Sequence, residues 1–258
     1  TAVRLEGSGP GKTEAWYILE ADAGARLVLG LKAGVDRTGL SEALEKGQVE
    51  SVLRGVEVHA SEAYYVHAGL LHAIGPGVTL FEIQQNVDLT YRFYDWGRVD
   101  DQERPRELHV SKAMEALDAS PGEVEPFYGL SYKKEGMRIT ALAAGRYFAL
   151  ERWEIENEWD GHMSGSRFEV LTVMAGVGRL EAAGSEEVVE LTQGQTILLP
   201  AALGDYRILE SSGLILLRSF VPDLEADVFR PLKGLGFSPG EIQKLAGRRR
   251  PNDLSVFS

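Results

Sequence analysis

Cysteine is absent from the 258 residues of this sequence, and only five histidines are present. Without cysteine, the chain can form neither disulfide bonds nor thiolate ligands for a metal ion. Any metal ion would therefore be held by histidine together with Glu, Asp or Gln side chains. The positions of the few histidines carry most of the information about such a site.

Basic residues are also scarce relative to acidic ones. The chain has 27 Lys and Arg against 39 Asp and Glu, which gives a formal net charge of −12. This balance argues against nucleic acid as a partner, because a phosphate backbone needs a basic protein face. A chain this acidic would need a local basic pocket to bind a phosphorylated small molecule.

Long hydrophobic runs are missing as well. No apolar stretch approaches the roughly 20 residues that a membrane-spanning helix needs, so we expect no membrane partner. The first residues, 1–6, have neither the charge pattern nor the apolar core of a signal peptide. A cytoplasmic location is therefore the expectation.

Short apolar segments separated by glycine-containing turns make up much of the chain. In the first half they predict strands and two short amphipathic helices; the strands lie at 14–20, 26–31, 56–59, 63–66, 78–84 and 89–95, the helices at about 40–53 and 107–117. From about Tyr128 to Val221, further short strands follow one another closely. This rhythm predicts a mainly β protein, either a sandwich or a barrel.

Prolines and a loss of rhythm suggest the domain boundaries. Pro105, Pro121 and Pro126 surround the second predicted helix, so residues 105–127 are expected to connect a first module, 1–104, with a second, 128–222. Residues 223–258 lack the strand rhythm and are expected to form a C-terminal tail, with a solvated or loosely packed segment at 247–251.

One histidine stands out by its surroundings. His72 follows a glycine turn at Gly69, between the strand that ends at Val66 and the strand that carries Glu82. Such a turn can direct an imidazole into a barrel mouth, where it suits a divalent metal. The alternative is a histidine that only caps the turn, and the spacing alone does not separate the two.

Two further segments suggest anion binding. Lys12 follows a glycine-rich loop, but the spacing from Gly7 to Gly11 is one residue short of a phosphate-binding P-loop and a strand follows instead of a helix, which excludes that motif. The run from Glu82 to Arg98 is too polar for an apolar core. It predicts either a wet cavity in which arginines hold a phosphate or a salt-bridged polar face.

Three motifs in order resemble a known family. They are Gly-Lys-Thr-Glu-Ala-Trp-Tyr at 11–17, Ala-Gly-x-x-His-Ala at 68–73, and the run Glu-Ile-Gln-Gln-Asn-x-Asp-x-Thr-Tyr-Arg at 82–92 that continues to Asp-Trp-Gly-Arg at 95–98. Together they are similar to type I mannose-6-phosphate isomerases of the short bacterial and archaeal branch. The resemblance covers about residues 5–221 and implies two cupin-type (jelly-roll) β-barrel modules with a few short helices, the first module carrying the active site.

The resemblance also implies one Zn²⁺ per chain, with Glu14 and His72 as two of its ligands. In the family, a Gln-x-His segment upstream of the Lys-Thr-Glu motif supplies the others, and this sequence does not contain it. Either an upstream segment supplies these ligands, which we favour, or the metal site is degenerate. His59 is expected at a solvent-facing strand position, and His67 stands where the family usually has proline. The second module, in which Ser164 follows His162, is expected to be metal-free.

The implied activity is the interconversion of mannose-6-phosphate and fructose-6-phosphate through an enediol. Such a reaction needs a base, an electrophile and a phosphate anchor. Glu82 is the first candidate for proton transfer. Arg92 would stabilise the enediolate or hold phosphate, and Lys12 would add positive charge. The residues expected to bind the substrate are Lys12, Gln84, Arg92 and Arg98.

Two other functions stay open at this point. A non-catalytic cupin that binds a sugar phosphate as a sensor or assembly component would explain the missing ligands. A storage-type structural barrel would explain the fold but not the polar run from Glu82 to Arg98.

Overall fold

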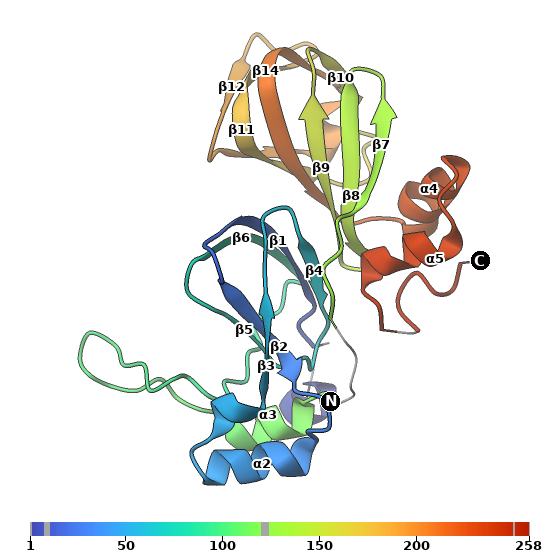
Figure 1. The fold of residues 1–258 in the computed structure, drawn as a ribbon. Helices are drawn as coiled ribbons and strands as arrows, with labels where there is room; N and C mark the ends of the chain where they lie inside the picture. Colours follow the sequence, from blue (N-terminus) through green and yellow to red (C-terminus); the bar gives the residue numbers. More distant parts are fainter. Residues whose placement is uncertain (1, 8–10, 120–123, 250, 258) are drawn as a thin grey trace. The chain divides into compact units, whose positions relative to one another are not determined.

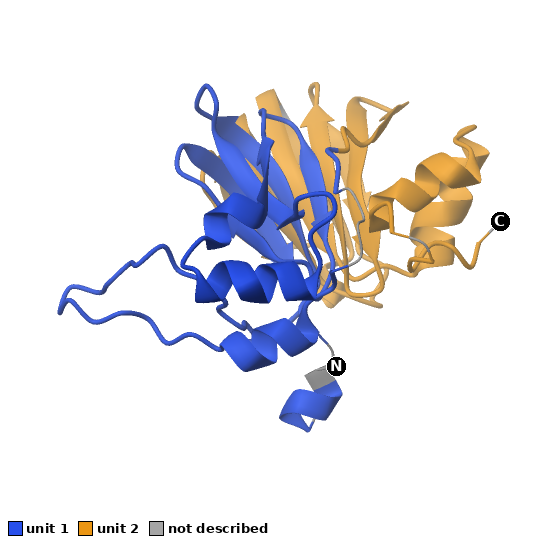
Figure 2. Cartoon of the chain, turned by 60° about the horizontal axis from the view of Figure 1, so that its bottom comes forward, with its two compact units in different colours: residues 1–126 blue, residues 127–258 orange. Residues whose placement is uncertain are grey.

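A computed structural model of the chain describes residues 2–7, 11–119, 124–249 and 251–257 (Figure 1). The chain forms two compact units, 1–126 and 127–258 (Figure 2). The predicted connector lies in the first unit and residues 223–258 lie in the second, while the finer division into modules stays a prediction. Residues 8–10 of the predicted glycine-rich loop, and Pro121, lie outside the described residues. No helix in the described part of the chain is long and apolar enough to cross a membrane.

In unit 1 the described residues build two small antiparallel sheets. β1 (Glu14–Ala21) lies between β4 (Ala63–Val66) and β6 (Val78–Gln84). In the second sheet, β2 (Arg26–Leu31) lies between β3 (Leu53–Glu57) and β5 (His72–Ile74). Side chains that alternate along β1 and β2 point to one face of each sheet, and these faces share a buried core of Trp16, Ile18, Leu27, Leu29, Val58, Tyr64 and Val66.

Helices close one end of unit 1. They are α1 (Ala2–Glu6), α2 (Arg37–Glu45), the 3₁₀ helix η1 (Val49–Val52) and α3 (Val110–Ala116). α2 begins at Asp36, whose side chain accepts a hydrogen bond from the Gly39 N–H at 2.9 Å. Leu40 of α2 packs with Phe93 and Leu117 in a second apolar cluster. Both predicted helices are therefore confirmed, the first as α2 followed by η1.

The predicted strand at 89–95 is wrong. This segment has no regular secondary structure, because its backbone partner is the start of α3 and not a neighbouring strand. The His109 N–H donates to the Arg92 carbonyl at 2.7 Å, and the Arg92 N–H donates to His109 Nδ1 at 3.3 Å. The segment consequently runs along the wall of a cavity.

Unit 2 is a curled eight-stranded antiparallel assembly. Its strand order is β12-β11-β14-β9-β8-β7, with β10 on β14 and β13 on β11. The strands are β7 (Leu130–Lys134), β8 (Met137–Gly145), β9 (Phe148–Ile155), β10 (Trp159–His162), β11 (Glu169–Ala182), β12 (Val188–Thr192), β13 (Thr196–Leu199) and β14 (Asp205–Phe220). The interior is apolar and includes Trp153, Leu171 and Leu216. The prediction of a mainly β, cupin-type fold is confirmed.

The C-terminal segment packs on this sheet and does not trail from it. It contains η3 (Leu224–Phe229), α4 (Arg230–Gly234), α5 (Pro239–Ile242) and η4 (Gln243–Ala246). Phe229, Ile242 and Leu254 are buried in a cluster with Phe220 of β14. Within the predicted solvated segment, Arg248 and Arg249 are exposed, and Arg250 lies outside the described residues.

Candidate active site

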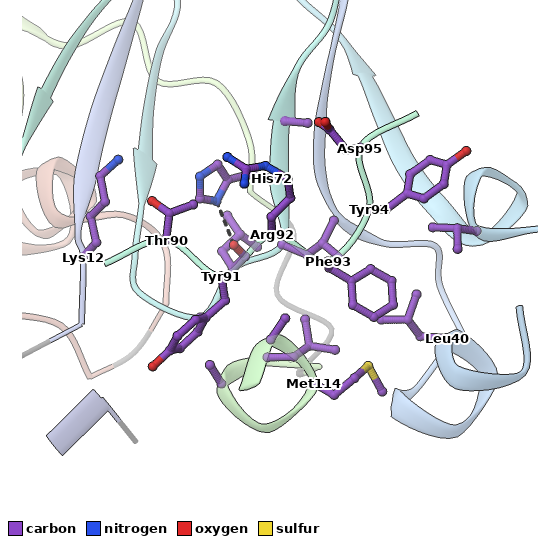
Figure 3. A pocket seen from close by; sticks show the side chains of 18 of the residues that line it. Lys12, Leu40, His72, Thr90, Tyr91, Arg92, Phe93, Tyr94, Asp95 and Met114 are labelled. Carbon is purple, nitrogen blue, oxygen red and sulfur yellow. Dashed lines mark hydrogen bonds between the residues drawn. The ribbon is translucent and has the colours of Figure 1, made fainter. Parts of the chain in front are cut away.

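A cavity of about 490 Å³ lies in unit 1 between the loop at 68–73, the segment 89–98 and the helices α2 and α3 (Figure 3). Positively charged side chains outnumber carboxylates among the residues that line it. Four permanently cationic side chains face one carboxylate, that of Asp95; the cations are Lys12, Arg92, Arg98 and Arg106. This is the local basic pocket that an acidic chain needs in order to bind a phosphorylated molecule.

Glu14 is the most deeply buried carboxylate next to this cavity, with 1% of its surface exposed. Its Oε1 lies 3.0 Å from His72 Nε2, and its Oε2 lies 2.7 Å from Lys12 Nζ. Burial raises the pKa of Glu14, but His72 and Lys12 outweigh burial, so its pKa lies below the ordinary value. The Glu14 carboxylate is therefore held ionised between the Lys12 ammonium and the His72 imidazole.

His72, the first residue of β5, points one ring nitrogen at this carboxylate. Its other nitrogen, Nδ1, lies 2.8 Å from the Leu70 carbonyl, which fixes the proton on Nδ1 and leaves Nε2 facing Glu14. Burial lowers the pKa of His72, and Glu14 outweighs burial so that the pKa is raised. Histidines that bind metal ions show this arrangement, with the second ring N–H on a carbonyl or carboxylate. A histidine that only caps the turn would also contact the Leu70 carbonyl, so metal binding by His72 stays a prediction.

β6 brings two more predicted residues to the same face. Glu82 pairs with Trp16 and Gln84 pairs with Glu14 across the β1–β6 ladder, as the two-residue period of a strand requires. Lys12 Nζ lies 3.4 Å from Glu82 Oε1 and so bridges the two glutamates. Burial lowers the pKa of Lys12, but Glu14 and Glu82 outweigh it and raise the pKa.

The two predicted arginines line the cavity from the segment after β6. Arg92 Nη1 donates to the Glu107 carbonyl at 3.2 Å. Arg98 lies over the Trp96 ring, 5.5 Å from its centroid, with Nε 3.8 Å from Asp95 Oδ1. Sequence reasoning missed Arg106, which also lines the cavity. No local pattern could have singled it out, because it belongs to the stretch expected to be a connector.

The loop that carries His72 is fastened to the end of α3. The Asp118 N–H donates to the Gly69 carbonyl at 2.8 Å, and His67 Nε2 lies 3.5 Å from Asp118 Oδ2. Arg37 of α2 donates to the Leu117 carbonyl in the same region. The histidine at position 67, which departs from the family pattern, thus contributes to this attachment.

Gly69 permits this close approach, and its replacement by alanine tests the attachment. At Gly69, φ is +90°, and an added Cβ would lie 2.8 Å from the Ala116 carbonyl oxygen. We expect Gly69→Ala to displace the loop and lower turnover of the substrate by about 10- to 100-fold, since misplacements of about 1 Å carry such costs. Steady-state kinetics would measure this loss.

Gly24→Ala is the matched control for that substitution. Gly24 has a similar φ of +78° but open space at the Cβ position. Gly24→Ala should lower the free energy of unfolding by about 1–3 kcal/mol through backbone strain, and it should leave turnover unchanged. Equal turnover in the two variants would contradict the positioning role of the loop.

The other histidines lie apart from Glu14 and His72. The His59 side chain is 70% exposed just after β3, as expected of a solvent-facing position. His109 caps α3 beside Arg92. His162 of unit 2 is exposed, with Nδ1 2.6 Å from Asp205 Oδ1. Within the described ranges, no three His, Asp or Glu side chains are grouped so that they could hold a metal ion.

Known proteins match this chain over most of its length. It is 32% identical over 218 residues to the mannose-6-phosphate isomerase of Streptococcus mutans, a match that covers 81% of this chain and 67% of that protein. The chain belongs to the mannose-6-phosphate isomerase family. It is also 32% identical over 198 residues to mannose-6-phosphate isomerase ManA of Bacillus subtilis, covering 77% of this chain and 61% of ManA. No family model matches.

The crystal structure of the mannose-6-phosphate isomerase from Bacillus subtilis agrees with this assignment. It superposes with a TM-score of 0.75 at 32% identity, covering 84% of this chain and 67% of that one. The family resemblance of the three sequence motifs is therefore confirmed. The chain spans between 61% and 67% of the length of these relatives.

Proposed function

We propose that this chain interconverts mannose-6-phosphate and fructose-6-phosphate. The observation that carries the proposal is the cationic cavity of unit 1, whose lining residues Lys12 and His72 contact Glu14, and Lys12 also contacts Glu82. A phosphorylated sugar requires the positive charge, and an aldose–ketose isomerisation requires a base beside it. Relatives of this chain bear the name of that reaction.

Zinc is part of the proposal, and the donor chemistry of the site fits it. Glu14 is buried and ionised with Oε1 facing His72 Nε2 at 3.0 Å, and His72 presents Nε2 while Nδ1 is held by a carbonyl. Carboxylate oxygen and imidazole nitrogen are both zinc ligands. Glu14 and His72 would hold the ion, which when bound polarises the oxygens of the sugar. A catalytic zinc site has three protein ligands, so at least one further ligand is needed.

The remaining steps belong to the side chains around Lys12. Glu82 would move the proton between C2 and C1, since its carboxylate lies beside the cavity and is not buried. Lys12, held 2.7 Å and 3.4 Å from the two glutamates, would help to keep Glu14 ionised and would orient Glu82. Arg92 lines the cavity without a carboxylate partner of its own among the described residues, and it would stabilise the negative charge of the enediolate.

Turnover of mannose-6-phosphate by the purified chain, with added zinc and again after treatment with a chelator, tests the proposal. We expect fructose-6-phosphate to form with zinc present and its formation to stop after chelation, because the ligands alone cannot polarise the sugar oxygens. Restored turnover on adding zinc back is the control for irreversible damage. Activity that persists unchanged after complete metal removal would contradict the zinc assignment.

One observation favours a second candidate function. Because no three metal-binding side chains gather among the described residues, the chain would also suit a sensor or assembly component that binds a sugar phosphate without converting it. The same experiment separates the two. A folded, zinc-supplied sample that binds fructose-6-phosphate but shows no turnover would favour the sensor.

A further inference from the structure

We propose that Arg106, positioned by Asp95, forms with Arg98 the phosphate-binding end of the cavity. This inference rests on the proposed function and deepens it, because it assigns the two ends of the cavity to different parts of the substrate. Asp95 is a positioning residue in this proposal, and the two arginines are the groups that would contact phosphate.

The contacts of Asp95 carry the first step. Asp95 is 8% exposed, and both of its oxygens are engaged by one guanidinium: Arg106 Nε donates to Oδ2 at 2.8 Å, and Arg106 Nη2 donates to Oδ1. A two-point contact of this kind fixes the plane of the guanidinium. It occupies one edge of Arg106 and leaves the donors of Nη1 for an anion in the cavity that Arg106 lines.

Charge balance around the cavity carries the second step. Lys12 faces two carboxylates, Glu14 and Glu82, so its charge is already neutralised. Arg98 and Arg106 share the single carboxylate of Asp95. Arg92 has no carboxylate partner among the described residues and acts electrostatically on the same Asp95. The excess of positive charge therefore lies around Asp95 and away from the contacts of Lys12 with Glu14 and Glu82, and a dianionic phosphate is most favoured there.

Distance along the chain carries the third step. His72, a proposed metal ligand, lies beside Arg92, and Asp95 comes three residues later on the same cavity wall (Figure 3). Three residues span at most about 10 Å, a separation comparable with the length of a hexose phosphate. A sugar with its C1–C2 edge at His72 could thus place its phosphate at Arg98 and Arg106.

The base of an exposed arm builds this end of the cavity. Residues 96–105 extend away from unit 1 (Figures 1 and 2) and are braced by the Val99–Pro105 bridge and by the Asp100–Arg104 ion pair. The Asp95–Arg106 pair closes the arm where it leaves the unit. Arg104 lies in the same arm and is also paired with an aspartate, but it does not line the cavity, which makes it a matched control for Arg106.

The test compares binding of fructose-6-phosphate with binding of fructose, by calorimetry on the full chain, in Arg106→Met and Arg104→Met. We expect Arg106→Met to weaken fructose-6-phosphate binding by about 10- to 100-fold, as for loss of a charge-assisted contact, and to leave fructose binding unchanged. Arg104→Met should change neither. A residue with only a structural role would not distinguish the two sugars.

Two further variants keep the test decisive if Arg106→Met folds poorly. Arg106→Lys keeps the positive charge but removes the planar guanidinium that makes the two-point contact with Asp95. Asp95→Asn keeps Arg106 but weakens the contact that fixes its orientation. Both variants should weaken fructose-6-phosphate binding by less than Arg106→Met does. In the double variant D95N/R106M, the aspartate substitution should add little further loss, because the hydrogen bonds of the Asp95 carboxylate are made with Arg106, and Arg98 lies farther away at 3.8 Å.

The outcomes separate this inference from the proposed function. If the chain isomerises mannose-6-phosphate and Arg106→Met keeps the wild-type affinity for fructose-6-phosphate, the phosphate assignment is overturned and the function stands. If fructose-6-phosphate binding depends on Arg106 in a chain without turnover, the phosphate assignment stands and the function fails. Absence of any preference for the phosphorylated sugar in the wild-type chain overturns the assignment.

Discussion

Replacing Arg92 by alanine is expected to lower kcat for mannose-6-phosphate by about 10²- to 10³-fold, the cost of removing one donor that stabilises developing negative charge. The chain should remain folded, because among the described residues the Arg92 side chain donates only to the exposed Glu107 backbone, at 3.2 Å. The contacts with His109 are made by the Arg92 backbone and survive the substitution. Steady-state kinetics and circular dichroism would measure the two effects.

Arg104→Ala provides the control for this variant. It removes the same charge from the same unit at a position that does not line the cavity, so its turnover should equal that of the unchanged chain. Near-normal turnover in Arg92→Ala would remove Arg92 from the reaction. A loss confined to KM would instead place Arg92 in substrate binding.

The largest expected effect on stability comes from Arg218→Met in unit 2. Arg218 Nη1 lies 2.9 Å from Glu151 Oε2, and Arg218 Nε lies 2.6 Å from Glu169 Oε2. Its guanidinium also stacks 4.0 Å from the Phe220 ring centroid. Burial lowers the pKa of Arg218, but Glu151 and Glu169 outweigh it and hold the pKa above its ordinary value.

Removing Arg218 takes the cation away from Glu151 and leaves Glu169, among the described residues, with only the more distant Arg167, whose Nε lies 3.9 Å from Glu169 Oε1. We expect the free energy of unfolding to fall by about 3–5 kcal/mol, as for breaking a buried ion pair. Hydrogen exchange of the amides in β9, β11 and β14 measures this loss within unit 2.

Two comparisons test the physical reason for this loss. The double variant R218M/E169Q, which also removes one stranded charge, should be more stable than Arg218→Met alone. Arg138→Met, at an exposed position of β8 in the same sheet, should change stability by no more than about 0.5 kcal/mol. If the double variant is less stable than Arg218→Met, the loss of stability comes mainly from lost packing and not from the unpaired carboxylates.

Sequence patterns were sufficient where the cause is local. β1 and β6 follow from short apolar runs bounded by turn residues. The two-residue period of a strand also places Glu82 and Gln84 on one face. The short strand β5, which His72 begins, was not among the predicted strands. The family assignment rests on short motifs within these elements.

Sequence patterns failed where the partner is distant. The segment 89–95 has the composition of a strand, yet its backbone bonds to His109 and forms no ladder. The ion pair of Asp95 with Arg106 joins residues eleven positions apart in an arm without regular structure. β-propensity reports how a residue fits a pleated surface and not which backbone lies beside it.

The sequence by itself determined the class of protein: mainly β, acidic, free of thiol ligands, with Glu14 and His72 as the outstanding metal-binding candidates. Only the tertiary structure decided that Lys12 forms ion pairs with two glutamates, and that the unpaired positive charge lies around Asp95. Strand pairing brings together Glu14 and Gln84, seventy positions apart in the chain. Electrostatic interactions depend on such distances in space, which the order of residues along a chain does not contain.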